Sequence, residues 1–118
     1  DLMSRCDLDI ISGDDSLTLP LMAIGGVGVI SVLANLIPRD VKTMCAAAAA
    51  GEWAKARELH LKMFKLARYM FIETNPIPIK TSMAVRGMMA EEFRLPLCEM
   101  QPANREKLLT ALKEYGIR

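Results

Sequence analysis

Residues 8–35 read LDIISGDDSLTLPLMAIGGVGVISVLAN, and this stretch decides how the rest of the sequence can fold. Leu8–Ser12 is a short apolar run that ends at a polar turn, and Val27–Leu33 is β-branched and apolar on both faces. Between them, Pro20 suits the first turn of a helix, and Gly25-Gly26 ends it because glycine enters the left-handed conformation at little cost. The pattern therefore predicts a strand, a helix and a second strand.

A strand that is apolar on both faces belongs in a parallel sheet covered by helices. Two strands alone would leave unpaired edges open to water. The sequence has 118 residues, whereas a complete (β/α)8 barrel needs about 250. We therefore expect the chain to be part of a larger barrel, with sequence missing upstream of Asp1, where neither an initiating Met nor a leader occurs.

Proline and glycine divide the downstream sequence into helices. Pro38 begins a helix, and Gly51 ends it. Glu52–Ile72 has the clearest amphipathic pattern, and a further helix is expected over Lys80–Met89. The last helix is expected to begin at Pro102.

This order of elements predicts an α/β fold in two parts. We expect residues 1–51 to form the last βα units of a barrel and residues 52–118 to form a C-terminal helical domain. Because the second part has no strand, the isolated chain is expected to be mostly helical.

The composition argues against several classes of partner. Apolar residues make up 52% of the sequence and aromatic residues only 5%. This excess of aliphatic residues suits a chain that buries surface against other subunits as well as against itself, and we expect a homo-oligomer. The 15 Lys and Arg are balanced by 14 Asp and Glu, so neither nucleic acid nor an anionic membrane surface is expected as a partner. No apolar run reaches the roughly 20 residues that a membrane-spanning helix needs.

The three cysteines carry little chemistry. Cys6, Cys45 and Cys98 lie far apart, without a Cys-x-x-Cys or a Cys/His ligand spacing. They indicate a reducing compartment, and we expect a cytoplasmic protein without a structural metal. The neighbouring carboxylates of Asp14 and Asp15 have no third ligand nearby, so we expect no metal site and no cofactor.

Six motifs, in the order in which they occur, carry a family resemblance. They are Ile11-Ser12-Gly13-Asp14-Asp15, Gly28-Val29-Ile30-Ser31-Val32 with Ala34-Asn35, Pro38-Arg39-Asp40, Asn75-Pro76-Ile77-Pro78-Ile79-Lys80, Leu95-Pro96-Leu97 and Leu109-Thr110-Ala111-Leu112-Lys113. Together they resemble the C-terminal part of the dihydrodipicolinate synthase family of pyruvate-dependent class I aldolases. The resemblance implies that Leu8–Ser12 and Val27–Leu33 are the seventh and eighth strands of a TIM barrel, which a C-terminal helical domain follows.

The resemblance also implies a Schiff-base lyase. Pyruvate would form an imine with a lysine on the sixth strand and then condense, as an enamine, with aspartate semialdehyde, at the start of diaminopimelate and lysine biosynthesis. That lysine, the tyrosine proton relay and its threonine, and the arginine that holds the aldehyde would all precede Asp1. None of the seven lysines present ends an apolar strand, so we expect this chain to hold no catalytic residue and to be inactive alone.

Two residues match positions that bind substrate in the family. Ile30 matches an isoleucine whose backbone carbonyl lies near the Schiff base, and Gly13 matches a glycine that lines the same pocket. From composition alone, Ile30 would be strand core and Gly13-Asp14-Asp15 a turn with an aspartate helix cap. His60 lies on the apolar face of its helix, where a core histidine is expected in place of a catalytic base.

Other functions stay open at this point. Another pyruvate aldolase, such as N-acetylneuraminate lyase, would share the chemistry, although the Asn75-Pro76-Ile77-Pro78 motif favours the synthase. A non-catalytic helical fragment or assembly module derived from the barrel would fit the absent lysine. Such a module has no evident need for the intact surroundings of Gly13 and Ile30.

Overall fold

The computed structural model describes residues 1–117, and the contacts within the chain divide it into two compact units, residues 1–61 and residues 62–118. Helix α3 (Trp53–Tyr69) begins in the first unit and ends in the second. The domain boundary expected between residues 51 and 52 stays a prediction.

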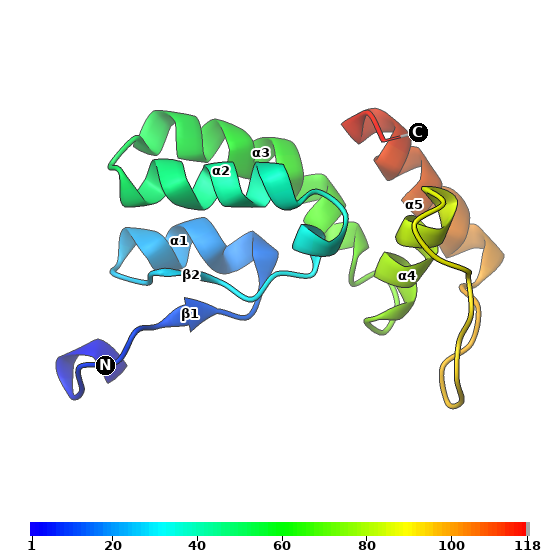
Figure 1. Cartoon of the computed structure of the whole chain (residues 1–118), viewed down its shortest axis with the longest axis horizontal. Helices are drawn as coiled ribbons and strands as arrows, with labels where there is room; N and C mark the ends of the chain where they lie inside the picture. Colours follow the sequence, from blue (N-terminus) through cyan, green and yellow to red (C-terminus); the bar gives the residue numbers. More distant parts are fainter. Residues whose placement is uncertain (118) are drawn as a thin grey trace. The chain divides into compact units, whose positions relative to one another are not determined.

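The first unit is built around two parallel strands. In sequence order it contains η1 (Leu2–Ser4), β1 (Ile11–Ser12), η2 (Asp15–Leu17), α1 (Thr18–Ala23), β2 (Gly28–Val29), η3 (Leu33–Asn35), α2 (Pro38–Ala49) and the start of α3. Ile11 pairs with Gly28 and Ser12 with Val29. Helix α1 connects the strands and packs on both, and α2 packs on α1 (Figure 1). The predicted strand, helix and parallel strand are therefore confirmed.

Both strands are shorter than predicted. The predicted strands were Leu8–Ser12 and Val27–Leu33, but only two residues of each strand are paired. One further backbone hydrogen bond lies at each end of the pair, from Val27 to Ile10 and from Ile30 to Ser12. A strand is extended by the neighbours that it pairs with, and within residues 1–117 each strand has only the other. Beyond Ile30 the backbone turns into η3, so Leu33 is helical.

Helices of the described residues pack on one face of the parallel pair and leave the other uncovered. Ile30 is 77% exposed and Ile11 is 49% exposed, and the pairing of Ile11 with Gly28 places both side chains on the same face. The buried apolar residues of this unit belong mainly to α1, η3 and α2 or directly follow one of them. They include Leu19, Met22, Leu33, Leu36, Val41 and Met44. One face of the parallel pair is thus packed and the other is open.

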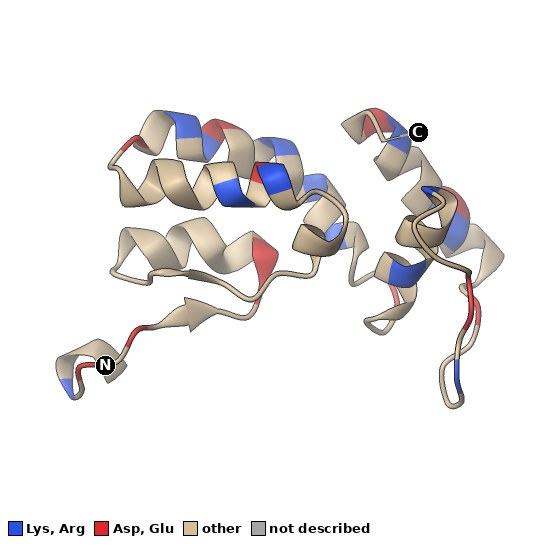
Figure 2. Cartoon of the chain, in the orientation of Figure 1, with Lys and Arg blue, Asp and Glu red and all other residues tan. Residues whose placement is uncertain are grey.

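The second unit is helical. It contains the rest of α3, α4 (Ile77–Val85) and α5 (Pro102–Tyr115). Helix α5 packs on α4, and the buried side chains of this unit include Met63, Leu66, Met70, Ile79, Leu108 and Leu112. Helix α3 carries one acidic residue, Glu58, among five basic ones, Lys55, Arg57, Lys62, Lys65 and Arg68 (Figure 2).

Helix α4 begins earlier than predicted. It starts at Ile77, directly after a cis peptide bond between Asn75 and Pro76, and not at Lys80. Pro78 lies in its first turn, where the missing backbone N–H is not needed. The segment between α4 and α5 has no regular structure and includes a cis bond before Pro96.

Candidate functional site

The two residues predicted to bind substrate lie at the same edge of the parallel pair. Gly13 directly follows β1, and Ile30 directly follows β2. The Ile30 amide donates a hydrogen bond to the Ser12 carbonyl oxygen at 2.9 Å, so Ile30 lies beside the residue that precedes Gly13. Carboxyl ends of parallel strands are the edge at which ligands bind in α/β folds.

Neither residue is explained by packing within the described chain. A Cβ atom added at Gly13 would meet no atom of residues 1–117 within 4 Å, and Gly13 is not among the glycines with positive φ. The side chain of Ile30 is mostly exposed. Their part in substrate binding therefore stays a prediction, one that local packing neither requires nor obstructs.

An apolar hollow of about 470 Å³ lies along β1 and α1. Ile30 does not line it. Six of the lining residues are Ile11, Gly13, Leu17, Pro20, Leu21 and Ile24. Because its walls are mainly apolar and Asp14 is the charged group on its rim, the hollow suits the packing of another apolar element better than the binding of a carboxylate such as pyruvate.

Asp14 caps the turn that follows β1. Its carboxylate accepts hydrogen bonds from the Ser16 amide at 2.7 Å, from the Ser16 hydroxyl at 2.6 Å and from the Leu17 amide at 3.2 Å. This is the helix-cap role that the sequence predicts for an aspartate at this position.

Asp15 joins the two strand ends, which the sequence analysis missed. Its buried carboxylate accepts hydrogen bonds from the Ser31 hydroxyl and from the amides of Val32 and Leu33, the latter two at 3.0 Å each. The Ser31 hydroxyl oxygen also accepts a hydrogen bond from the Ala34 amide at 2.8 Å. Since parallel strands end at one edge, an acidic residue after the first strand and a serine after the second could have indicated this contact.

Two titratable side chains of the first unit have shifted pKa values. Burial, assisted by the negative charge of Asp15, raises the pKa of the Cys45 thiol above its usual value. Burial lowers the pKa of His60, which is partly exposed rather than fully in the core. Neither shift places a reactive group at the edge that holds Gly13 and Ile30.

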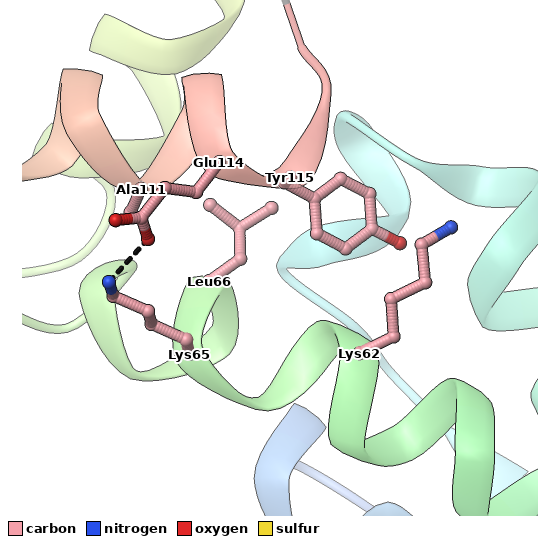
Figure 3. Close-up of a pocket in the computed structure, with 6 residues that line it drawn as sticks. All are labelled: Lys62, Lys65, Leu66, Ala111, Glu114 and Tyr115. Atoms are coloured by element: carbon pink, nitrogen blue, oxygen red, sulfur yellow. Dashed lines mark hydrogen bonds and ion pairs between the residues drawn. The ribbon is translucent and has the colours of Figure 1, made fainter.

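A small hollow of about 140 Å³ lies between α3 and α5 in the second unit (Figure 3). Lys65 forms an ion pair with Glu114 there, and the Lys62 ammonium lies 4.8 Å from the centre of the Tyr115 ring. The hydrogen bond to Glu114 raises the pKa of Lys65, which keeps the amine protonated. A lysine that forms a Schiff base needs the opposite shift, so these contacts fasten one helix to the other and do not prepare a nucleophile.

Two kinds of feature are absent from residues 1–117. This part of the chain has no group of three or more His, Cys, Asp or Glu side chains that could hold a metal ion. In the same residues, no helix combines the length and the apolar character needed to cross a membrane.

Comparison with known proteins gives consistent matches over nearly the whole chain. The model of the dihydrodipicolinate synthetase family matches residues 3–115. A 4-hydroxy-tetrahydrodipicolinate synthase of Methanococcus aeolicus is 50% identical over 117 residues, which are 99% of this chain and 41% of that protein. The chain thus spans about two fifths of the length of the curated relatives that it matches.

Solved structures agree in fold. The crystal structure of dihydrodipicolinate synthase from Aquifex aeolicus superposes with a TM-score of 0.96 at 49% identity, over 98% of this chain and 40% of that one. A chloride-inhibited dihydrodipicolinate synthase from Acinetobacter baumannii, complexed with pyruvate, gives a TM-score of 0.90 at 38% identity, over 94% of this chain and 38% of that one.

These matches confirm the predicted fold class: the parallel strands and their helices are part of a TIM barrel, which a helical region follows. They also confirm the resemblance drawn from the six motifs, all of which lie within the matched residues. The chain belongs to the dihydrodipicolinate synthetase family.

Proposed function

We propose that this chain supplies the last two βα units and the C-terminal helical region of a Schiff-base lyase that condenses pyruvate with aspartate semialdehyde. The observation that carries the proposal is the shared position of Gly13 and Ile30 at the carboxyl edge of the parallel pair. The names of the relatives support the same reaction, and pyruvate is the ligand of one solved relative.

In this proposal the imine-forming lysine comes from a part of the barrel outside these 118 residues. A desolvated amine attacks the ketone of pyruvate, and loss of water gives an iminium. The iminium acidifies the adjacent methyl group, and loss of a proton from it gives an enamine whose carbon is the nucleophile. The backbone carbonyl of Ile30 then contacts the bound pyruvate, and the absent side chain at Gly13 leaves room for it. This chain alone has no catalytic residue.

The open face of the parallel pair supports the need for a partner. Ile11 and Ile30 leave apolar surface exposed on this face, beside unpaired strand edges that further strands of the barrel would cover. We also propose a homo-oligomer for the complete enzyme. The free thiols of Cys6, Cys45 and Cys98 support a reducing compartment such as the cytoplasm.

The test is to trap the imine. The chain is incubated with pyruvate and borohydride, alone and after assembly with the N-terminal portion of the Aquifex aeolicus relative, and intact masses are measured. We expect 13.1 kDa without adduct for the chain in both samples, and one reduced pyruvate on the N-terminal portion after assembly. A pyruvate adduct on this chain would contradict the proposed place of the lysine.

The assembled sample also separates the alternatives. Consumption of pyruvate with aspartate semialdehyde supports the synthase, whereas release of pyruvate from N-acetylneuraminate would identify the other aldolase. If the two parts copurify and the N-terminal portion gains no adduct, the non-catalytic assembly module is the correct interpretation.

A further inference from the structure

We propose that Asp15 is a positioning residue, which fixes the direction of the Ile30 carbonyl group by holding the residues that follow it. The catalytic consequence rests on the proposed function, because that function gives the Ile30 carbonyl its role at the substrate. The hydrogen bonds that carry the proposal do not depend on it.

Both carboxylate oxygens of Asp15 bind the segment after β2. Oδ1 accepts from the Ser31 hydroxyl, and Oδ2 accepts from the amides of Val32 and Leu33 at 3.0 Å each. Asp15 is only 8% exposed, and hydrogen bonds to an ionised acceptor are stronger than neutral ones, more so where water is excluded. Three donors on consecutive residues are thereby held by one side chain.

The peptide group that carries the Ile30 carbonyl lies between two fixed points. On one side, the Ile30 amide donates to the Ser12 carbonyl oxygen at 2.9 Å. On the other side, the Ser31 hydroxyl donates to Asp15 and its oxygen accepts from the Ala34 amide at 2.8 Å, so this hydroxyl has one orientation. These bonds hold the Ile30 nitrogen and the Ser31 side chain, so the residues on both sides of this peptide group are restrained.

Packing cannot replace this attachment in the described residues. The Ile30 side chain is 77% exposed, so van der Waals contacts with residues 1–117 do not hold it. The carboxylate of the neighbouring Asp14 instead accepts hydrogen bonds within its own turn, from Ser16 and Leu17. The two adjacent aspartates are therefore separable, since Asp14 shapes the start of η2 and Asp15 positions the other strand end.

The first experiment measures the attachment in the 118-residue chain itself. Asp15→Ala is expected to speed amide hydrogen exchange of Val32 and Leu33 about 10-fold or more and to shift the Ile30 carbonyl ¹³C resonance, because the acceptor is lost. The matched control is Asp14→Ala, which is expected to affect Ser16 and Leu17 and to leave the Ile30 resonance in place. Unchanged exchange at Val32 and Leu33 in Asp15→Ala would overturn the proposal.

The second experiment measures the chemistry after assembly with the N-terminal portion of the relative. We expect Asp15→Ala to slow single-turnover pyruvate trapping by about 10- to 100-fold, with little change in the pyruvate concentration that gives half of the maximal trapping rate, because a misplaced group of this kind acts on the reaction rather than on binding. Asp15→Asn keeps an acceptor for the two amides and is expected to recover most of the rate.

The control also distinguishes positioning from loss of structure. If Asp14→Ala and Asp15→Ala lower the melting temperature alike and slow trapping alike, Asp15 has only a structural role and the proposal is wrong. If the unmodified assembly traps no pyruvate, the proposed function fails. The exchange rates and the Ile30 resonance then still decide whether Asp15 holds the carbonyl.

Discussion

The hydroxyl of Thr18 donates a hydrogen bond to the carbonyl oxygen of Asp14 at 2.9 Å, in the first turn of α1. Thr81, in α4, is as fully buried as Thr18, but its hydroxyl has no hydrogen-bond partner among residues 1–117. The two threonine side chains are equally buried, but only the Thr18 hydroxyl has a hydrogen bond within these residues. That hydrogen bond determines whether a buried hydroxyl stabilises the fold.

This difference predicts opposite effects of the same substitution. Thr81→Val is expected to raise the free energy of unfolding by about 1 kcal/mol, because it removes an unsatisfied buried hydroxyl, and Thr18→Val is expected to lower it by about 1 kcal/mol. Urea unfolding followed by circular dichroism measures both values. Changes of the same sign in the two variants would contradict this explanation.

The partial burial of His60 predicts a pH dependence of stability. Its pKa in the folded chain is lower than the ordinary 6.5, so the unfolded chain binds more protons between the two values. The free energy of unfolding is therefore expected to fall as the pH falls through about 6.5 toward the lower, folded-state pKa, and to change no further through this group below it. His60→Gln should remove this part of the dependence, as thermal unfolding between pH 7.5 and about 5 would measure. An identical pH profile in the variant would rule out His60 as its source.

The three cysteines are expected to differ in reactivity. Cys6 and Cys98 are exposed, whereas Cys45 is partly buried and its pKa is raised by burial and by Asp15. Alkylation by iodoacetamide at pH 8 should therefore modify Cys45 last, as peptide mass spectrometry of timed samples would show. Asp15→Asn should speed the reaction at Cys45 and leave Cys6 and Cys98 unchanged. Equal rates at all three thiols would mean that Cys45 is not protected.

The open edge of the parallel pair predicts that the isolated chain associates with itself. Ile11→Lys places a charge on a β1 side chain that is 49% exposed and is expected to shift the chain toward monomer, since charged edge strands resist pairing. Leu61→Lys, on the exposed surface of α3, is the matched control and should leave association unchanged. Sedimentation velocity over a range of concentrations measures both. A stable monomer for the unmodified chain would count against this prediction.

Much of the fold follows from proline and glycine. Pro38 and Pro102 each begin the helix predicted for them, because a first-turn proline has no amide to satisfy. Gly25, Gly51 and Gly116 have positive φ values at the ends of α1, α2 and α5, as helix-stopping glycines do. These features were predictable because they depend on one residue and its immediate neighbours.

The remaining errors concern contacts that local sequence does not describe. The lengths of β1 and β2 depend on neighbouring strands. The substrate-binding prediction for Gly13 and Ile30 came from family resemblance, since neither residue type has a signature of its own. The bonds of Asp15 were missed because they join positions that only the parallel register brings together.

The pairing of Ile11 with Gly28 has a consequence for the order of folding. The partners lie close in sequence and α1 fills the connection, so the entropy lost in closing this loop is small, and it grows only with the logarithm of loop length. Contacts of short sequence separation form quickly, and the strand pair is therefore expected among the early structures of a folding chain. A further strand of the barrel would then pair with an edge whose register is already set.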